Sequence, residues 1–254
     1  MTILLAFSAA AAPPQPICTD RPTKANAVCT VPSGAIQVES APVAWSLTEA
    51  GGVRTGLVTV GGIVVKFGLD DSSDLQIGAS PLIVAKVREG GSADKISGFG
   101  DIQLRYKRRL SGADAKVQVA VIPFVKLPTA KRGIGNGKVE GGVALPISLA
   151  AGQAATLTFG PELDLLADAD GHGRHAAIVN LVNFAAPVAP RLTAIGEVWT
   201  NFNFDPAGTV KQASLDSALA YAVSNQAQLD AGANLGLTRD SADVELYGGV
   251  SVRF

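Results

Sequence analysis

The residues of this chain that could do chemistry gather in one short stretch, DADGHGRH, at residues 168–175. It holds both histidines of the chain together with Asp168 and Asp170. An Asp-x-Asp-Gly opening is typical of a calcium loop, but such a loop needs a bidentate glutamate at its twelfth position, where Val179 stands. We interpret the stretch as a hydrated external loop, with weak binding of a divalent metal as the alternative, and predict no metal site.

A second stretch, KRGIGNGKV at residues 131–139, has the glycine content of a phosphate-binding loop. The pattern G-x-x-x-x-G-K-[ST] needs glycine where Arg132 stands and a hydroxyl group where Val139 stands. The sequence therefore indicates an exposed turn at this place, and it predicts no cofactor.

The composition limits the class of protein. Of 254 residues 47% are hydrophobic, yet no stretch reaches the roughly 18 consecutive apolar residues that a membrane helix needs. The 21 basic and 22 acidic residues leave a net charge of −1, which gives no field that would attract nucleic acid. A surface that meets lipid must therefore be assembled from many short segments, and no nucleic-acid partner is predicted.

The N-terminal region has the features of an exported chain. Residues 1–12 combine an apolar stretch with an alanine run and are interpreted as a signal peptide, although the usual basic start is missing. Residues 13–33 are expected to form a periplasmic N-terminal segment. It carries the only two cysteines, Cys18 and Cys29, which are expected to form a disulfide in an oxidising compartment. Two free thiols or part of a metal site would give the same pattern, but no histidine lies nearby.

From residue 34 to residue 254 the chain alternates between strand-like segments and turn signals, without helical periodicity. We predict twelve strands, and an even number lets an antiparallel sheet close with both chain ends on one side. The twelve predicted strands are 34–47, 54–69, 73–87, 99–110, 115–128, 138–150, 154–167, 175–187, 190–204, 209–223, 227–239 and 242–254.

Alternation within the strands predicts which surface each face meets. Residues 227–239 place Leu229 and Leu235 on one face and Asp230 and Asn234 on the other. Long apolar faces that lie opposite charged residues at strand centres are typical of a wall with lipid outside and water inside. We therefore predict an all-β protein, a single antiparallel transmembrane β-barrel of about 12 strands, with membrane lipid as a partner.

The connections between strands alternate in length. Starting with the first, every second connection is on average longer and richer in glycine and charge than the others. Outer-membrane barrels have short periplasmic turns and longer external loops, so this asymmetry predicts a location in the outer membrane of a Gram-negative bacterium. The external loops 88–98 and 129–137 are expected to limit access to the lumen.

Three stretches resemble one bacterial family. TDRPTKANAVCTVPSGAIQVES (19–40), KFGLDDSSDLQIGAS (66–80) and GFGDIQLRYKRRL (98–110) resemble the outer-membrane barrels labelled "MetA-pathway of phenol degradation", often described as transporters. The family also tends to carry the Leu-Pro-Thr of residues 127–129. The resemblance implies a porin-like barrel with a signal peptide that passes small organic compounds, including aromatic or hydrophobic ones, by passive or facilitated diffusion. The two cysteines are not part of the family pattern.

The period of two also predicts which charges face the lumen. Bases concentrate in the early strands and acids in the later ones, so a closed barrel would have one positive wall and one negative wall. Such a field could orient polar solutes in a passage, or the charges could pair across a narrow lumen and plug it. The predicted lumen-lining residues are Lys66, Lys86, Arg105, Lys107, Lys126, Glu140, Glu162, Asp164, Glu197, Asp216, Asp230, Asp243 and Glu245.

The last strand predicts how the barrel closes and how it is assembled. Residues 242–254 are expected to pair with 34–47, which abolishes the sheet edges. The terminal Phe254 looks like the aromatic signal by which the outer-membrane assembly machinery recognises barrels.

Two other functions remain open. A structural or adhesive barrel that transports nothing would show the same strands and the same charges. A lipid-modifying barrel enzyme would need a histidine paired with a serine nucleophile. His172 and His175 lack the H-x-S-N-G pattern of barrel phospholipases, and Ala176 and Ala177 follow His175. We therefore predict no catalytic residue and expect that the chain is not an enzyme.

Overall fold

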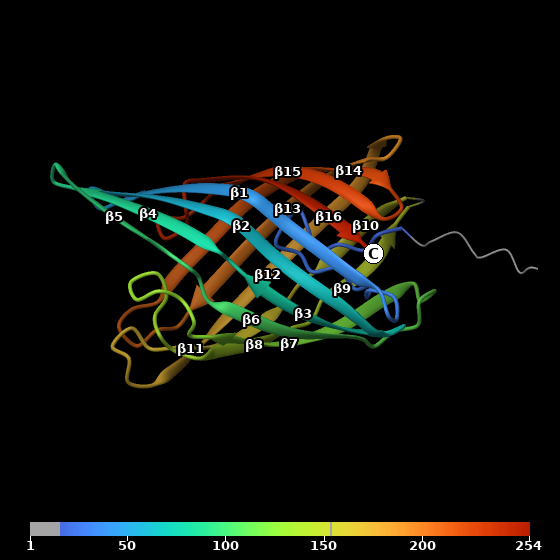
Figure 1. The fold of residues 1–254 in the computed structure, drawn as a ribbon, viewed down its shortest axis with the longest axis horizontal. Coiled ribbons are helices and arrows are strands. Elements are labelled where there is room, and N and C mark those ends of the chain that lie inside the picture. The colour runs from blue at the N-terminus through green and yellow to red at the C-terminus, as the bar shows by residue number, and fades with distance from the viewer. Residues whose placement is uncertain (1–15, 153) are drawn as a thin grey trace, which may run out of the picture.

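The computed structural model describes residues 16–152 and 154–254, which form one closed antiparallel sheet (Figure 1). The predicted signal peptide, 1–12, lies outside the described residues. Among the described residues, no helix is long and apolar enough to cross a membrane. The strand segments are β1 (Ile36–Ala50), β2 (Val53–Asp70), β3 (Ser73–Ala79), β4 (Leu82–Glu89), β5 (Ser92–Gly98), β6 (Ile102–Arg109), β7 (Val117–Leu127), β8 (Glu140–Ala144), β9 (Ile147–Ala151), β10 (Ala155–Phe159), β11 (Glu162–Ala167), β12 (Arg174–Ala189), β13 (Leu192–Asn203), β14 (Val210–Ser224), β15 (Ala227–Gly236) and β16 (Val244–Arg253).

Sixteen segments make twelve wall strands, because four strands are each built of two segments. β3 and β4 together form one strand, and both pair with β2. β5 and β6 form the next strand, in which β5 pairs with β4 and β6 pairs with β3. β8 and β9 both pair with β7, and β10 and β11 both pair with β12. β1 pairs with both β2 and β16, so the sheet closes. The predicted twelve-stranded barrel is confirmed.

Prolines lie at three of the four places where a wall strand is divided into two segments. Pro81 lies between β3 and β4, Pro146 between β8 and β9, and Pro161 between β10 and β11. Proline has no N–H to donate to a sheet ladder. The neighbouring groups keep the sheet joined, since the N–H of Leu145 donates to Pro161 O at 2.9 Å and that of Gly160 to Leu181 O at 3.0 Å.

One predicted external loop is a pair of strands instead. Residues 88–98 were expected to be a loop, but β4 and β5 continue to a two-residue turn at Gly90 and Gly91. Both glycines have positive φ values, 53° and 88°, which side chains other than glycine's rarely adopt. Figure 1 shows this hairpin reaching beyond the other strands at one end of the barrel. Residues 129–137 do form a loop of the long-loop end.

Burial in this wall is inverted relative to a soluble protein. In β12 the inward file is buried from His175 to Asn183, while Val182 and Phe184 on the outward file are 43% and 48% exposed. The buried polar residues include Lys66 and Lys107, each 1% exposed. An apolar exterior around a polar interior is the pattern expected where lipid surrounds the wall.

The first described residues lie inside the barrel. Residues 16–35, which we call the N-terminal segment, run as an irregular coil within the wall before β1 begins (Figure 1). They leave the lumen next to β2, where the carbonyl oxygen of Pro32 would lie 1.9 Å from a Cβ atom on Gly68. The described part of the predicted periplasmic N-terminal segment, 13–33, lies inside the wall, because its polar groups bind inward side chains.

Candidate functional site: the occupied lumen

A disulfide ties the N-terminal segment into a loop. Cys18 and Cys29 are bonded, with Cα atoms 6.0 Å apart, within the usual range for disulfides. The side-chain amide of Gln37, at the start of β1, donates to the carbonyl oxygen of Cys18 at 2.6 Å. The loop is thus anchored to the wall where the wall begins.

Asp20 binds the basic side of the lumen. Its carboxylate accepts hydrogen bonds from Lys66 Nζ at 2.6 Å and Lys107 Nζ at 2.7 Å, and also from the backbone N–H of Ala27 at 2.8 Å. The three charged side chains are at most 10% exposed. Lys66 also pairs with Glu39 of β1 at 2.5 Å. Two lysines from β2 and β6 therefore converge on one carboxylate of the N-terminal segment.

Arg21 binds the acidic side. Its Nε and Nη2 atoms donate to the two carboxylate oxygens of Asp230 at 3.1 and 2.7 Å, a bidentate pair. The guanidinium carbon lies 5.9 Å from the centroid of the Tyr247 ring. A Cβ atom on Gly249 would lie 2.1 Å from Arg21 Nη2, so this glycine leaves the space that the guanidinium fills.

Lys24 extends the contact with the acidic side. Its Nζ atom lies 2.5 Å from Asp216 Oδ2 and 5.0 Å from the centroid of the Trp199 ring. The backbone N–H groups of Lys24 and Ala25 each donate to a different oxygen of Glu197, both at 3.0 Å. One carboxylate of β13 therefore caps the backbone of the N-terminal segment while its neighbour on β14 binds the side chain.

The segment matches the lumen charge by charge. Asp20 faces lysines, whereas Arg21 and Lys24 face carboxylates, so each charge of the stretch TDRPTK meets the opposite sign. The N-terminal segment thus joins Lys66 and Lys107 on the basic wall to Asp216 and Asp230 on the acidic wall.

Most predicted lumen-lining residues lie on the inward file of the observed register. Arg105 binds Asn26 of the segment, while Lys126 pairs with Asp101 at 2.8 Å and Glu140 at 3.0 Å. A role for these residues in a passage stays a prediction. The inward set is Lys66, Arg105, Lys107, Lys126, Glu140, Glu162, Asp164, Glu197, Asp216, Asp230 and Glu245.

Lys86 was predicted for the lumen, but the structure places it on the outer face. It pairs with Gly56 in β2 and lines a hollow with Trp45 and Leu47, which belong to the outward file of β1. The break in the strand at Pro81 shifts the alternation by one position, and a period of two cannot reveal such a shift.

Asp243 also lies elsewhere than predicted. It is exposed at the rim, before β16 begins, and its carboxylate accepts a hydrogen bond from the N–H of Glu49 at 2.6 Å. Its backbone N–H donates to Leu47 O at 2.8 Å. Asp243 therefore joins the ends of β1 and β16 and does not line the lumen.

Sequence reasoning missed the residues that fill the lumen. Asp20, Arg21 and Lys24 lie before the first strand, where the alternation of apolar and polar residues cannot predict which way a side chain points. One signal was present: the predicted inward positions hold more carboxylates than bases, and a buried charge needs a partner of opposite sign.

Two cavities meet the N-terminal segment. One of about 440 Å³ is lined by Arg21, Asp101 and Lys126 together with apolar residues of β2 and β3. The other, of about 230 Å³, is lined by Arg21, Lys24 and residues of β15 and β16. Arg21 belongs to both, so the segment forms part of the lining of the free space in the lumen.

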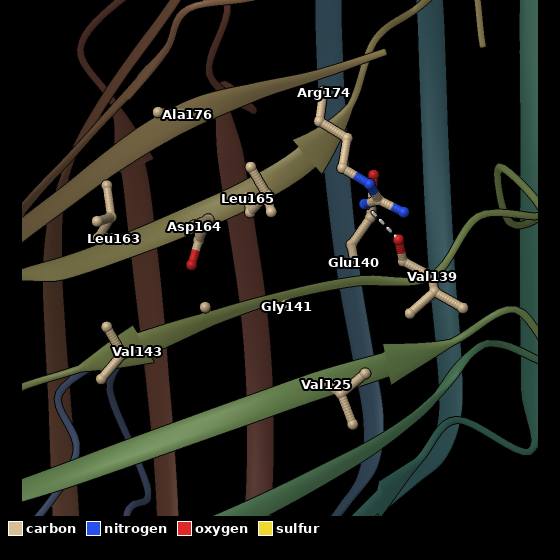
Figure 2. Close-up of a pocket in the computed structure, with 11 residues that line it drawn as sticks. Val125, Val139, Glu140, Gly141, Val143, Leu163, Asp164, Leu165, Arg174 and Ala176 are labelled. Atoms are coloured by element: carbon tan, nitrogen blue, oxygen red, sulfur yellow. Dashed lines mark hydrogen bonds between the residues drawn. The ribbon is translucent and has the colours of Figure 1, made fainter. Parts of the chain in front are cut away.

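A larger hollow, of about 600 Å³, lies on the outer face (Figure 2). Leu163 and Leu165 of the outward file border it, and Gly141 contributes no side chain to fill it. Asp164 of the inward file reaches it from behind. Since the lining is mainly apolar and faces outward, membrane lipid is the medium expected there.

Polar groups also gather at the long-loop end of the barrel. Asp205, in the connection after β13, accepts hydrogen bonds from the backbone N–H groups of Ala207 at 2.7 Å and Ala169 at 2.8 Å. These donors hold the pKa of Asp205 below its ordinary value. The carboxylate therefore stays ionised in neutral solution.

Comparisons with known proteins agree with this fold. The chain resembles the COG4313 outer-membrane channel from Pseudomonas putida F1 at 13% identity and a TM-score of 0.70, over 89% of this chain and 98% of that one. It resembles the NanC porin at 10% identity and a TM-score of 0.54, over 85% and 98%. The translocator domain of the autotransporter NalP from Neisseria meningitidis matches at 12% identity and a TM-score of 0.54, over 88% and 90%. No curated protein sequence matches the chain.

A family profile identifies the sequence itself. The profile described as "Putative MetA-pathway of phenol degradation" matches residues 19–254, which include both the N-terminal segment from Thr19 onward and the whole wall. The chain therefore belongs to this family and is a β-barrel of the Gram-negative outer membrane.

Proposed function

We propose that this protein is an outer-membrane channel for small organic solutes whose lumen is narrowed by its own N-terminal segment. The observation that supports this most is the pairing of Asp20, Arg21 and Lys24 with charges on opposite walls. A barrel without a passage needs no such fit, because apolar side chains fill a lumen at lower cost than buried ion pairs do.

The pairing also suggests how the channel works. Ion pairs between the segment and the wall can exchange partners with water and with a polar solute, whereas an apolar core cannot. Movement of the segment joins the two cavities that Arg21 separates. Solutes then diffuse along a lumen lined by the inward charges, with the opposed walls orienting polar groups.

The cavities support a small solute with one apolar part. The larger one, at about 440 Å³, lies within the range of small-ligand sites and combines charged residues with Ile63, Val64 and Ala79. An aromatic ring with one polar substituent matches such a lining. The family description, which refers to phenol degradation, supports the same class of solute.

A structural barrel is the second candidate. It is favoured by the same filled lumen, since every charge of the TDRPTK stretch has a partner and the described segment lies within the wall. In that case the segment serves stability alone, and the paired charges never separate.

Conductance in planar bilayers tests the channel. The purified protein is expected to give small current steps, and Asp230→Asn or Lys107→Gln is expected to enlarge them because each weakens one anchor of the segment. Silent bilayers for all three proteins would support the structural barrel instead. Lipid hydrolysis that disappears in His175→Ala would support the enzyme.

Liposome swelling tests the solute class. Proteoliposomes that hold the Asp230→Asn variant are expected to swell faster in benzoate than in arabinose, since an aromatic acid matches both the apolar and the charged lining. Equal rates would show a passage without preference for aromatic compounds.

A further inference from the structure

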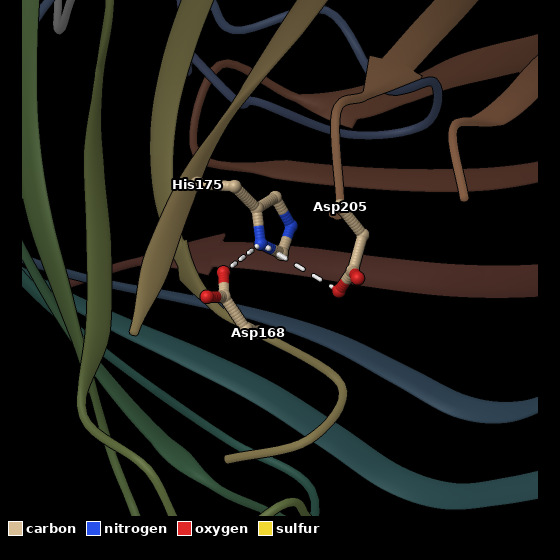
Figure 3. A group of neighbouring side chains, drawn as sticks. All are labelled: Asp168, His175 and Asp205. Carbon is tan, nitrogen blue, oxygen red and sulfur yellow. Dashed lines mark hydrogen bonds and ion pairs between the residues drawn. The ribbon is translucent and has the colours of Figure 1, made fainter. Parts of the chain in front are cut away.

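Three side chains from three segments meet at the long-loop end of the barrel. Asp168 follows β11, His175 is the second residue of β12, and Asp205 follows β13. Figure 3 shows the imidazole ring with one edge turned toward both carboxylates. The cluster has no part in the function proposed above.

The ligand atoms are spaced for one small cation. His175 Nδ1 lies 2.8 Å from Asp168 Oδ1 and 3.6 Å from Asp205 Oδ2, and one ligand atom from each residue lies within 4.8 Å of the others. The three side chains are 5%, 13% and 11% exposed, in the order His175, Asp168, Asp205. A cation held between them would be shielded from bulk water on most sides.

The charge in the cluster is not balanced by a permanent cation. Within the described residues, the ion pairs of both carboxylates are formed with His175, and no lysine or arginine pairs with either. A neutral imidazole has a single N–H group, which can satisfy one of the two carboxylates at Nδ1. Two partly buried carboxylates around one nitrogen therefore favour a bound positive charge.

The histidine itself points to a missing partner. His175 as a whole residue, backbone included, is 8% exposed. Its Nε2 atom is buried without a hydrogen-bond partner among the described residues. Buried polar atoms are normally satisfied. Nδ1 thus faces two carboxylates while Nε2 accepts or donates no hydrogen bond within the described residues, so no contact at Nε2 fixes the ring and Nδ1 can serve as the ligand atom.

The backbone holds both carboxylates in place. Asp205 accepts hydrogen bonds from two backbone N–H groups, one of them from Ala169 next to Asp168. Gly173 has a φ of 143°, and a Cβ atom there would lie 2.3 Å from Asp168 Oδ2. Glycine at this position therefore leaves the space that the Asp168 carboxylate occupies, and the site is formed before an ion arrives.

We propose that Asp168, His175 and Asp205 form a binding site for a divalent transition-metal ion, with Zn²⁺ as the representative, at the mouth of the barrel. One imidazole nitrogen and two carboxylate oxygens form a mixed donor set that suits Zn²⁺, whereas Ca²⁺ and Mg²⁺ prefer oxygen ligands alone. Water completes the coordination. The ion links the connection after β11 to that after β13 across β12.

Titration calorimetry with the full-length protein in detergent, purified without a histidine tag and stripped with a chelator, tests the site. One equivalent of Zn²⁺ is expected to bind, and Ca²⁺ at the same concentration is expected not to bind. His175→Gln and Asp205→Asn are each expected to weaken Zn²⁺ binding at least tenfold.

His172→Gln is the matched control, because His172 belongs to the same loop but not to the cluster. It is expected to keep the affinity of the unchanged protein. The site is refuted if His175→Gln binds Zn²⁺ as tightly as the unchanged protein, or if His172→Gln loses as much affinity. Heat-modified mobility in gel electrophoresis checks that each variant is a folded barrel. If His175→Gln does not fold, Asp168→Asn decides the question by the same criterion.

Discussion

Asp20 is the residue on which the contacts between the segment and the wall depend most. It accepts hydrogen bonds from two lysines of different strands, each 1% exposed. Replacing it by asparagine leaves both lysines near each other with one carboxylate fewer to balance them. Removing one partner of a buried pair typically costs about 3–5 kcal/mol.

We expect Asp20→Asn to release the N-terminal segment while the wall stays intact. In planar bilayers the variant should show larger and more frequent current steps than the unchanged protein. Thr30→Ser alters another residue of the N-terminal segment, keeps its hydroxyl group and removes no charge, so it should behave like the unchanged protein. A current unaltered by Asp20→Asn would mean that the segment does not limit conductance.

Gly249 offers a test that changes no charge. A side chain there collides with the guanidinium of Arg21. Gly248, one position earlier, lies on the outward file, and a Cβ atom on it would lie 3.6 Å from its nearest neighbour, an ordinary contact distance. Gly249→Leu is therefore expected to displace Arg21 and raise conductance, and Gly248→Leu should leave it unchanged. Equal currents in the two variants would contradict a role of Arg21 in narrowing the lumen.

At the scale of elements, the disulfide defines how far the N-terminal segment can move. It closes a loop of about a dozen residues, and a cross-link over such a loop contributes about 3 kcal/mol by restricting the unlinked chain. The double variant Cys18→Ser/Cys29→Ser keeps every ion pair but frees the loop. We expect broader current fluctuations of the same mean size, and reductant applied to the unchanged protein should reproduce them.

The end of β16 carries the predicted assembly signal. Phe254 is 74% exposed, and only its backbone is bonded to the wall, through Ile36 at 2.8 and 3.3 Å. Phe254→Ser should therefore leave the assembled barrel as stable as before and reduce the amount that reaches the outer membrane severalfold. Phe184→Ser, which removes an outward aromatic from β12, is the control and should lower the amount less.

Strand alternation was enough to predict the elements, since a closed wall with lipid on one side gives every strand the same period. The places where it failed are local breaks in that period. Pro81 reverses the faces of the following segment, which carries Lys86 outward. Residues 88–98 look like a loop because they are polar and rich in glycine, but a hairpin that projects from the wall has no apolar face to reveal it.

At the scale of the whole molecule, the segment sets the charge of the lumen. The wall alone presents more carboxylates than bases on its inward files, and Arg21 and Lys24 offset two of them. Arg21→Gln/Lys24→Gln should therefore make the channel prefer K⁺ over Cl⁻. A reversal potential measured in a KCl gradient should shift toward the K⁺ value, and no shift from the unchanged protein would contradict this account.

The contents of the lumen could not be predicted from the sequence for a physical reason. Arg21 and Asp230 are 209 positions apart, and Asp168 and Asp205 come together only because β12 and β13 are neighbours in the ring. Local patterns give the face of each side chain but not its partner across an enclosed space. Alternation therefore predicted most of the inward charges of the wall, but neither the charges of the N-terminal segment nor their partners.

The position of the N-terminal segment has a consequence for the order in which the barrel is built. Glu39 of β1 and Ser251 of β16 stand opposite each other at the closing seam, and the segment bonds to both, through Asp20 N–H at 3.2 Å and Thr19 Oγ1 at 3.2 Å. The segment thus lies across the junction of the first and last strands. Because these contacts join both edge strands from inside, we expect the N-terminal segment to favour their pairing when the barrel closes.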